Sequence, residues 1–210
     1  MHLEEIRKNY FQGELDESQL EENPFALFEK WLADAFERNE SEPTAMTIAT
    51  VDEEHKPHAR MVLLKEMTPE GFCFFTNYES HKAQQLFVNK HVALVFYWPS
   101  IERQVRIEGI AKKMNEESST DYFHKRPLES QLGAWASPQS RIIPSRQLLE
   151  HQFNEYRKKF GEQVPKPPFW GGFLISPTLF EFWQGRPNRL HDRIEYVKAQ
   201  NQWQMHRLAP

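Results

Sequence analysis

Apolar and polar residues alternate along much of this chain in short runs, which is typical of β-strands. In residues 103–114, for example, Gln104, Arg106 and Glu108 share one face while Val105 and Ile107 share the other. Strands are expected over residues 45–51, 58–67, 72–76, 91–98, 103–114, 172–176, 178–183, 193–198 and 202–208. These runs follow one another along the chain instead of alternating regularly with helices.

Helical periodicity appears in four places. The first helix is expected to begin after Asn23, a good capping residue, with Pro24 in its first turn and Phe28 and Leu32 on one face. Other helices are expected over residues 80–89, 115–137 with a break at Pro127, and 145–161. Sequential strands with inserted helices argue against a doubly wound parallel sheet and favour an antiparallel barrel or sandwich with helices outside it.

The length of 210 residues suits one domain with a small extension. Residues 1–22 are polar and weakly periodic, so we expect an N-terminal arm, followed by a single domain over residues 23–210. Within that domain, residues 165–210 return to strands after the helical middle third. A hydrophobic content of 39% is enough to form a core and argues against disorder.

Charge and cysteine content narrow the possible partners. The net charge of −4 gives no global attraction for nucleic acid, and no segment resembles a signal peptide or a membrane span. A lone cysteine, Cys73, fits a reducing compartment, so we expect a cytoplasmic protein. Glycine-rich phosphate loops are absent, and the histidines carry no metal-ligand spacing, so no metal is expected.

Basic and polar residues instead gather beside the expected strands. Arg60 and Lys65 bracket one apolar run, and Thr76 precedes an expected helix that begins with His81 and Lys82. A helix start that carries a hydroxyl and a cation suits a phosphate group. Each group has a plain alternative: charges at a strand end can reach water, and residues at a helix start can simply cap it.

Further polar groups follow later in the chain. Tyr122, Arg126 and Ser130 recur at four-residue spacing and would share a face of a continuous helix, which Pro127 makes less certain. The loop "SPQS" offers Gln139 and Ser140, and the segment "FEFWQGRPNRLHDR" (180–193) places three arginines and a histidine after a strand. Solvated helix faces or internal ion pairs would explain each group alone. Together the groups suggest a ligand with more than one phosphate, or two phosphorylated ligands.

These segments resemble the pyridoxine/pyridoxamine 5′-phosphate oxidases, in the same order and over residues 7–210. The block R-L-H-D-R is the most specific match, and "RMVLLK", "FFTNYESHK", "RQVRIEG", "SPQS" and the terminal "RLAP" support it. The resemblance implies an FMN-binding split β-barrel, an antiparallel Greek-key barrel with peripheral helices, active as a homodimer with FMN at the subunit interface. It implies oxidation of pyridoxamine or pyridoxine 5′-phosphate to pyridoxal 5′-phosphate, with O2 reduced to H2O2.

The resemblance also implies roles for individual residues. The FMN phosphate would be held by Arg60, Thr76, His81 and Lys82, with Gln139 and Ser140 of the other subunit. The remaining FMN contacts would come from Met61, Val62, Leu63, Leu64, Lys65, Phe75, Gln104, Trp183 and Arg193. The substrate would be bound by Lys65, Tyr122, Arg126 and Ser130, with Arg189 and His191 at the reacting carbon and Arg7 and Tyr10 as a lid. In the family an arginine often stands at position 81 and a tyrosine at position 75.

Two other functions stay open on the sequence alone. Flavin oxidases of phenazine biosynthesis share the implied fold and FMN site, although their larger apolar substrates should not need Tyr122, Arg126 and Ser130 together. A non-catalytic protein that binds flavin or pyridoxal phosphate is the other alternative, and the complete reacting-site block disfavours it.

Overall fold

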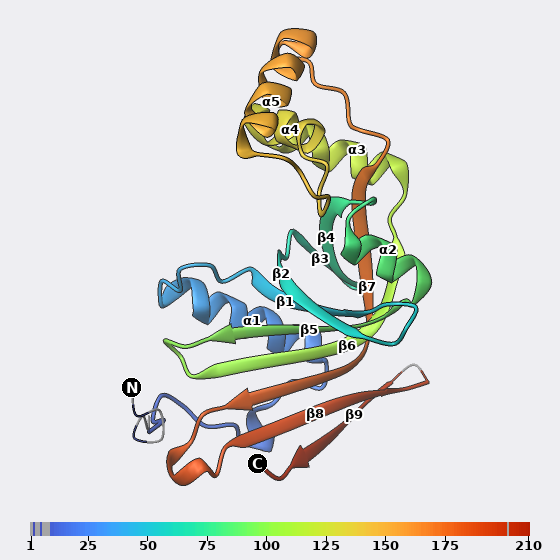
Figure 1. Cartoon of the computed structure of the whole chain (residues 1–210). Helices are drawn as coiled ribbons and strands as arrows, with labels where there is room; N and C mark the ends of the chain where they lie inside the picture. Colours follow the sequence, from blue (N-terminus) through green and yellow to red (C-terminus); the bar gives the residue numbers. More distant parts are fainter. Residues whose placement is uncertain (1, 3–4, 6–8, 201) are drawn as a thin grey trace.

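A computed structural model describes residues 2, 5, 9–200 and 202–210 of the chain. Nine strands in the described part form one curled, antiparallel sheet with the order β2-β1-β5-β6-β7-β4-β3, to which β8 and β9 are added beside β7 (Figure 1). The strands are β1 (Ala45–Val51), β2 (Pro57–Leu63), β3 (Glu66–Thr68), β4 (Gly71–Asn77), β5 (His91–Trp98), β6 (Arg103–Lys113), β7 (Trp170–Gln184), β8 (Asp192–Ala199) and β9 (Gln202–Leu208). The predicted antiparallel split barrel with added helices is therefore confirmed.

The expected helices are all present. They are α1 (Pro24–Glu37), α2 (His81–Val88), α3 (Glu116–Lys125), α4 (Leu128–Ala136) and α5 (Arg146–Phe160), with short 3-10 helices η2 (Glu17–Gln19) and η3 (Pro187–Arg189). The side chain of Asn23 accepts a hydrogen bond from the backbone N–H of Phe25, as expected of a capping residue. Pro127 separates α3 from α4, and the tight left-handed turn at Gly161 ends α5.

Two strand predictions are wrong in detail. The expected strand over 58–67 breaks after Leu63, because Leu64 N–H bonds to Thr44 on the β1 side while Lys65 N–H bonds to Cys73 in β4. The chain therefore crosses from one side of the barrel to the other at these two residues. The two runs expected over 172–176 and 178–183 form a single strand, β7.

Pro177 lies inside β7, although proline cannot donate a hydrogen bond to a neighbouring strand. The register between β6 and β7 shifts between Glu108 and Gly109, and Pro177 lies opposite Gly109 at that irregularity. A bulge of this kind tolerates the missing donor and bends the strand. As a result, one end of β7 pairs with β4 and the other pairs with β8.

The main core lies between α1 and the concave side of the sheet (Figure 1). Phe28 and Trp31 of α1 are almost fully buried, and their rings make edge contacts with Phe72, Phe96 and Phe182. A second, smaller cluster joins α3, α4 and α5 to the start of β7 through Phe123, Leu132, Val164 and Trp170. Within the described residues, no helix is long and apolar enough to span a membrane.

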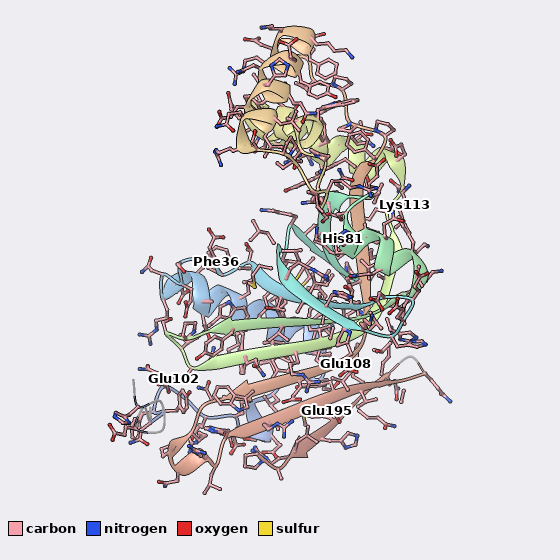
Figure 2. The ribbon with its side chains drawn as sticks, viewed as in Figure 1. Phe36, His81, Glu102, Glu108, Lys113 and Glu195 are labelled. Carbon is pink, nitrogen blue, oxygen red and sulfur yellow. The ribbon has the colours of Figure 1, made fainter. Side chains whose placement is uncertain are left out.

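We predict that Phe28→Ala lowers the free energy of unfolding by about 3–5 kcal/mol, because it removes a fully buried ring from the main core. Phe36→Ala is the matched control on the same helix, since Phe36 is 55% exposed and points away from the sheet (Figure 2). We expect the control to change the unfolding free energy by less than about 1 kcal/mol. Urea unfolding at equal protein concentration measures both, and equal losses would contradict the packing described above.

Candidate functional site

A pocket of about 360 Å³ opens between β2, β4, the start of α2 and the helices α3 and α4. Ten of the residues predicted from the sequence line it: Met61, Val62, Leu63, Lys65, Phe75, Thr76, Lys82, Tyr122, Arg126 and Gln139. Lys65, at the break between β2 and β3, lines the same pocket as Lys82. We call this cavity the phosphate pocket, because its donors are mostly cations and hydroxyls.

Lys82 is the central cation on one side of the phosphate pocket. Its Nζ lies 3.1 Å from Thr76 Oγ1, 3.4 Å from Ser80 Oγ and 3.3 Å from Gln139 Oε1. Among the described residues, no carboxylate forms an ion pair with it. Burial and the nearby positive charge of Arg60 lower the pKa of Lys82 from 10.5 to about 8. An anion at this position would relieve both effects.

Arg60 lies behind the lining of the phosphate pocket, on β2. Its guanidinium donates to Thr50 Oγ1 at 2.5 Å and to Gln85 Oε1 at 3.1 Å, so it ties the sheet to α2. Burial lowers the pKa of Arg60. His81 begins α2 and is exposed, outside the pocket lining (Figure 2). Of these two neighbours on α2, Lys82 and not His81 faces the pocket.

Arg126 is the central cation on the other side of the phosphate pocket. Its guanidinium lies 4.8 Å from the ring of Trp170 and 5.7 Å from that of Phe123. Its Nη1 is buried without a hydrogen-bond partner in the described part of the chain. A buried N–H group that lacks an acceptor is costly, and the cost is larger for a charged group. Burial also lowers the pKa of Arg126.

Tyr122 lies beside Arg126 and is held by aromatic stacking. Its ring centroid is 3.9 Å from that of Phe75, with the two rings 12° from parallel, and the Phe75 ring in turn stacks on Trp170. Burial raises the pKa of Tyr122, so its hydroxyl keeps its proton and can donate. Phenylalanine at position 75 therefore still supplies the flat surface that a tyrosine would supply there.

Four predicted residues of this region lie elsewhere than expected. Ser130 follows the break at Pro127, so it shares no continuous helix with Tyr122 and lies outside the pocket lining. Gln139, assigned by resemblance to another subunit, here accepts a hydrogen bond from Thr76 of its own chain at 3.0 Å. The short connection from α4 places it there. Ser140 is exposed with left-handed backbone angles, and Leu64 is buried in the main core instead of lining the pocket.

A second cluster surrounds His191, at the far end of β7 (Figure 1). The ring of His191 lies 4.7 Å from that of Trp183 and 5.5 Å from that of Tyr10. Its Nδ1 accepts a hydrogen bond of 3.1 Å from the backbone N–H of Arg186. Burial and the positive charge of Arg189 lower the pKa of His191. We call these residues the histidine cluster.

The loop that carries Arg189 has an unusual backbone. Asn188 and Arg189 both have positive φ, 57° and 62°, a conformation that L-residues other than glycine seldom adopt. Such strain persists only where the surroundings hold the chain in place, and it occurs often at functional sites. Arg7, predicted to act with Tyr10, lies outside the described residues.

Gln104, Trp183 and Arg193 stand directly opposite one another on three neighbouring strands, β6, β7 and β8. Residues in such a row point to the same face of a sheet, so the three predicted ring contacts share one surface. The row is supported by Glu181, whose buried carboxylate pairs with both Arg106 and Arg193. This acid was not among the predicted site residues, because its ion pairs to two arginines of neighbouring strands are visible only in the folded structure.

The comparisons with known proteins agree with this arrangement. Residues 32–160 match the family model described as pyridoxamine 5′-phosphate oxidase, and residues 170–210 match the model of the pyridoxine 5′-phosphate oxidase C-terminal dimerisation region.

The chain belongs to the pyridoxine/pyridoxamine 5′-phosphate oxidase family. It is therefore an oxidoreductase.

Relatives that carry the family name match along the whole chain. The pyridoxine/pyridoxamine 5′-phosphate oxidase of Microcystis aeruginosa is 50% identical over 99% of this chain and 98% of its own length. The corresponding protein of Crocosphaera subtropica is 51% identical over the full length of both.

Solved structures also match. PhzG from Burkholderia lata, in complex with tetrahydrophenazine-1-carboxylic acid, is 26% identical with a TM-score of 0.88 over 92% of this chain and 95% of its own. A pyridoxamine 5′-phosphate oxidase-related, FMN binding protein from Nostoc punctiforme is 17% identical with a TM-score of 0.70, over 87% of this chain and 97% of its own. The second likeness shows the fold alone.

Some residues of this oxidase's site carry no signal in the sequence. Trp170 follows a proline-rich connector and looks like an ordinary core residue, yet its ring lies against Arg126. Arg186 follows a strand in a polar segment, yet it is only 35% exposed and contacts Glu14 and Asp192. All of these contacts join residues far apart in the chain or across a loop, which periodicity does not predict.

We predict that Glu181→Gln lowers the free energy of unfolding by about 2–3 kcal/mol, since it removes a buried charge that two arginines share. Glu108→Gln is the matched control, because Glu108 also pairs with Arg106 but is about half exposed. The control should cost less than about 1 kcal/mol. Chemical unfolding measures both, and a Glu181→Gln protein as stable as the wild type would refute the supporting role of this carboxylate.

Proposed function

We propose that this oxidase converts pyridoxamine 5′-phosphate and pyridoxine 5′-phosphate to pyridoxal 5′-phosphate, with FMN as cofactor and O2 as electron acceptor, in the cytoplasm. The amine substrate with O2 and water would give pyridoxal 5′-phosphate, ammonia and H2O2. The alcohol substrate with O2 would give pyridoxal 5′-phosphate and H2O2. The names of the relatives and the family model support the substrate class.

The observation that carries the proposal is the unpaired Nη1 of Arg126, buried in the phosphate pocket. An arginine presents a planar pair of N–H donors that matches a phosphate group. Lys65 and Tyr122 line the same pocket and add a cation and a hydroxyl donor. We assign these three residues, with Ser130 from the start of α4, to the substrate phosphate. Holding it would place the rest of the substrate in a fixed orientation.

The other donors fit FMN. Lys82 and Thr76, with Arg60 behind them and Gln139 and Ser140 from the loop after α4, would hold its phosphate. Met61, Val62, Leu63 and Phe75 would provide backbone and apolar contacts along the pocket wall. The row Gln104, Trp183 and Arg193 lies at the other end of β7, so it would contact the ring from a second copy of the chain. When bound, FMN would accept two electrons from the substrate and pass them to O2.

The distance between the two clusters supports a homodimer. Trp170 lies in the phosphate pocket and Trp183 in the histidine cluster, and the thirteen residue steps between them along β7 span roughly 40 Å before its curl is allowed for. One small substrate cannot contact both clusters of one chain. A second copy that brings its own Arg189 and His191 to the phosphate pocket would complete the site, as the match to a dimerisation region also suggests.

The hydrogen bond to His191 suggests how that residue acts. Because Nδ1 accepts from the backbone N–H of Arg186, the proton of the neutral ring belongs on Nε2. The lowered pKa favours this neutral form near neutral pH. His191 would then donate from Nε2 to the oxygen or nitrogen on the reacting carbon of the substrate, while Arg189 supplies positive charge beside it. Both residues would orient the reacting group.

The direct test adds pyridoxamine or pyridoxine 5′-phosphate in air to the purified protein reconstituted with FMN. Pyridoxal 5′-phosphate is followed by absorbance and H2O2 by a peroxidase-coupled dye. Equal amounts of the two products are expected. A protein that binds FMN yet oxidises neither substrate would overturn the proposal. Turnover of a reduced phenazine carboxylate in the same assay would instead support the activity suggested by the PhzG likeness.

We predict that Arg126→Ala raises the KM for pyridoxamine 5′-phosphate about 30- to 100-fold, because the substrate phosphate loses its buried partner. Arg126→Lys should recover only part of the loss, since an ammonium cannot reproduce the planar pair of donors. FMN content should stay at the wild-type level in both variants. Arg157→Ala, in the same helical region but paired with Glu129 at the surface, is the control and should leave KM unchanged. Steady-state kinetics would refute the assignment if Arg126→Ala kept the wild-type KM.

We also predict that FMN affinity falls as pH rises above 8. Below that value Lys82 carries its proton in the free protein, whereas above it FMN binding must first restore the proton that burial has removed. Fluorescence titration should show roughly tenfold weaker binding at pH 9.5 than at pH 7.5. Lys82→Arg keeps its charge across this range, so its affinity should stay flat. Equal slopes for the two proteins would exclude Lys82 as the titrating group.

A further inference from the structure

The segment from Tyr10 to Glu21 belongs to the predicted N-terminal arm and is called the arm from here on. It contacts the rest of the chain at several points. The carboxylate of Glu102, at the end of the β5–β6 hairpin, accepts the backbone N–H groups of Phe11 at 2.7 Å and Gln12 at 3.1 Å (Figure 2). The hydroxyl of Tyr196 donates to the carbonyl of Glu21 at 2.8 Å. These contacts hold the two ends of the arm.

Arg207, near the C-terminal end of β9, binds the middle of the arm through hydrogen bonds and an ion pair. Its guanidinium pairs with both oxygens of Glu17, donates to the carbonyl of Leu15 at 2.7 Å and donates to Asp192 Oδ1 at 2.8 Å. The other oxygen of Asp192 accepts the N–H of Leu15 at 3.1 Å. One side chain therefore joins the arm to Asp192, the residue that follows His191.

Arg186 makes a similar connection to the arm at the other end of the loop 186–192, which contains Arg189 and His191. Its Nη1 lies 3.1 Å from the carbonyl of Gly13 and 3.1 Å from Glu14, and its Nε lies 3.5 Å from Asp192. Its backbone N–H is the donor to His191 Nδ1. The residues at both ends of the loop 186–192 therefore contact the arm and each other.

The arm in turn places an aromatic ring on the histidine cluster. Tyr10 makes edge contacts with Trp183 and His191, at centroid distances of 5.6 and 5.5 Å. The ring lies so close to Gly185 that a Cβ added there would come within 2.7 Å of it. The position of Tyr10 is therefore narrowly defined, and it depends on where the arm is held.

We propose that Arg207 is a positioning residue for the oxidase reaction: by joining the arm to Asp192, it holds Tyr10 and the loop 186–192 in register around His191. The inference rests on the proposed function for its kinetic readout. Arg207 lies outside the phosphate pocket, so it acts through Asp192 and the arm.

A purely stabilising surface ion pair is the alternative. Arg207 and Glu17 are 39% and 48% exposed, and a single pair at such exposure contributes little to stability. Arg207 differs from such a pair because it bonds to two separate segments at once, and one of them carries the histidine. Its loss should therefore change turnover more than it changes folding.

The main test compares Arg207→Ala and Arg207→Lys with wild type as FMN-loaded proteins, using pyridoxamine 5′-phosphate. In Arg207→Ala we expect kcat to fall about tenfold, because the reacting groups lose their alignment, while KM stays within about twofold. Arg207→Lys should not restore kcat, since an ammonium cannot pair with Glu17, Leu15 and Asp192 together. Arg146→Ala removes an exposed pair on α5 and serves as the unchanged control.

A double-mutant cycle with Tyr10→Ala tests whether the effect passes through the arm. If Arg207 acts by holding Tyr10 in position, the variant with both Arg207→Ala and Tyr10→Ala should lose little more activity than Tyr10→Ala alone. Hydrogen exchange supplies a second measurement, independent of activity: the Leu15 amide, bonded to Asp192, should exchange faster in Arg207→Ala. If Arg207→Ala does not fold, Glu17→Gln carries the same two measurements.

Three results would overturn the inference while leaving the proposed function intact: an unchanged kcat, a fully additive cycle, or a kcat restored by Arg207→Lys. Failure of the proposed function would look different, since wild type itself would then oxidise neither phosphorylated substrate. In that case the exchange of the Leu15 amide still decides whether Arg207 holds the arm.

Discussion

The hydrogen bonding of strand β7 is the constraint on which the rest of the molecule depends. This strand pairs with β6 along most of its length, with β4 at its first half and with β8 at its second. Its first residue, Trp170, lies under Arg126, and its penultimate residue, Trp183, lies against His191. Both candidate clusters are therefore built on one rigid element, and the length of that element keeps them apart within a chain.

Without a bound anion, the phosphate pocket lowers the stability of the fold. Burial opposes the charges of Lys82 and Arg126, and one N–H of Arg126 lacks an acceptor within the described residues. The aromatic stack of Phe75, Tyr122 and Trp170 fixes these groups in place. Donors that are already ordered and desolvated lose little entropy when an anion arrives. Binding of an anion, as proposed above, would recover the free energy lost in placing these groups.

Much of the fold followed from local pattern. The helices, their caps and most strands were predictable because each depends on residues close together in sequence, as with Asn23 at the start of α1. The errors arose where tertiary contacts override pattern. Pro177 suggested a strand end, yet the bulge opposite Gly109 carries β7 through it. The break at Leu64 and Lys65 was invisible because it is set by two different partner strands.

The residues of the candidate site also fall into those that sequence motifs predict and those that only tertiary contacts reveal. Arg60, Lys82, Arg126 and His191 could be chosen from the sequence because short motifs carry them. The residues that support them could not, since Trp170, Glu181 and Arg186 act through neighbours from distant segments. Gln139, which the resemblance assigned to a partner subunit, contacts Thr76 and Lys82 of its own chain in the single copy described, and its role across a dimer stays a prediction.

The arm and the C-terminal strand β9 both support the loop 186–192. The loop 186–192 contains two consecutive residues with left-handed backbone angles, so it cannot keep its shape by local preference alone. Its ends are joined to the arm by Arg186 and Asp192, and Asp192 is held in turn by Arg207, close to the last residue of the chain. Because both terminal segments must be in place before the loop is supported, its strained shape depends on the completed fold. The precision of the histidine cluster is thus a property of tertiary structure, which no single motif could have supplied.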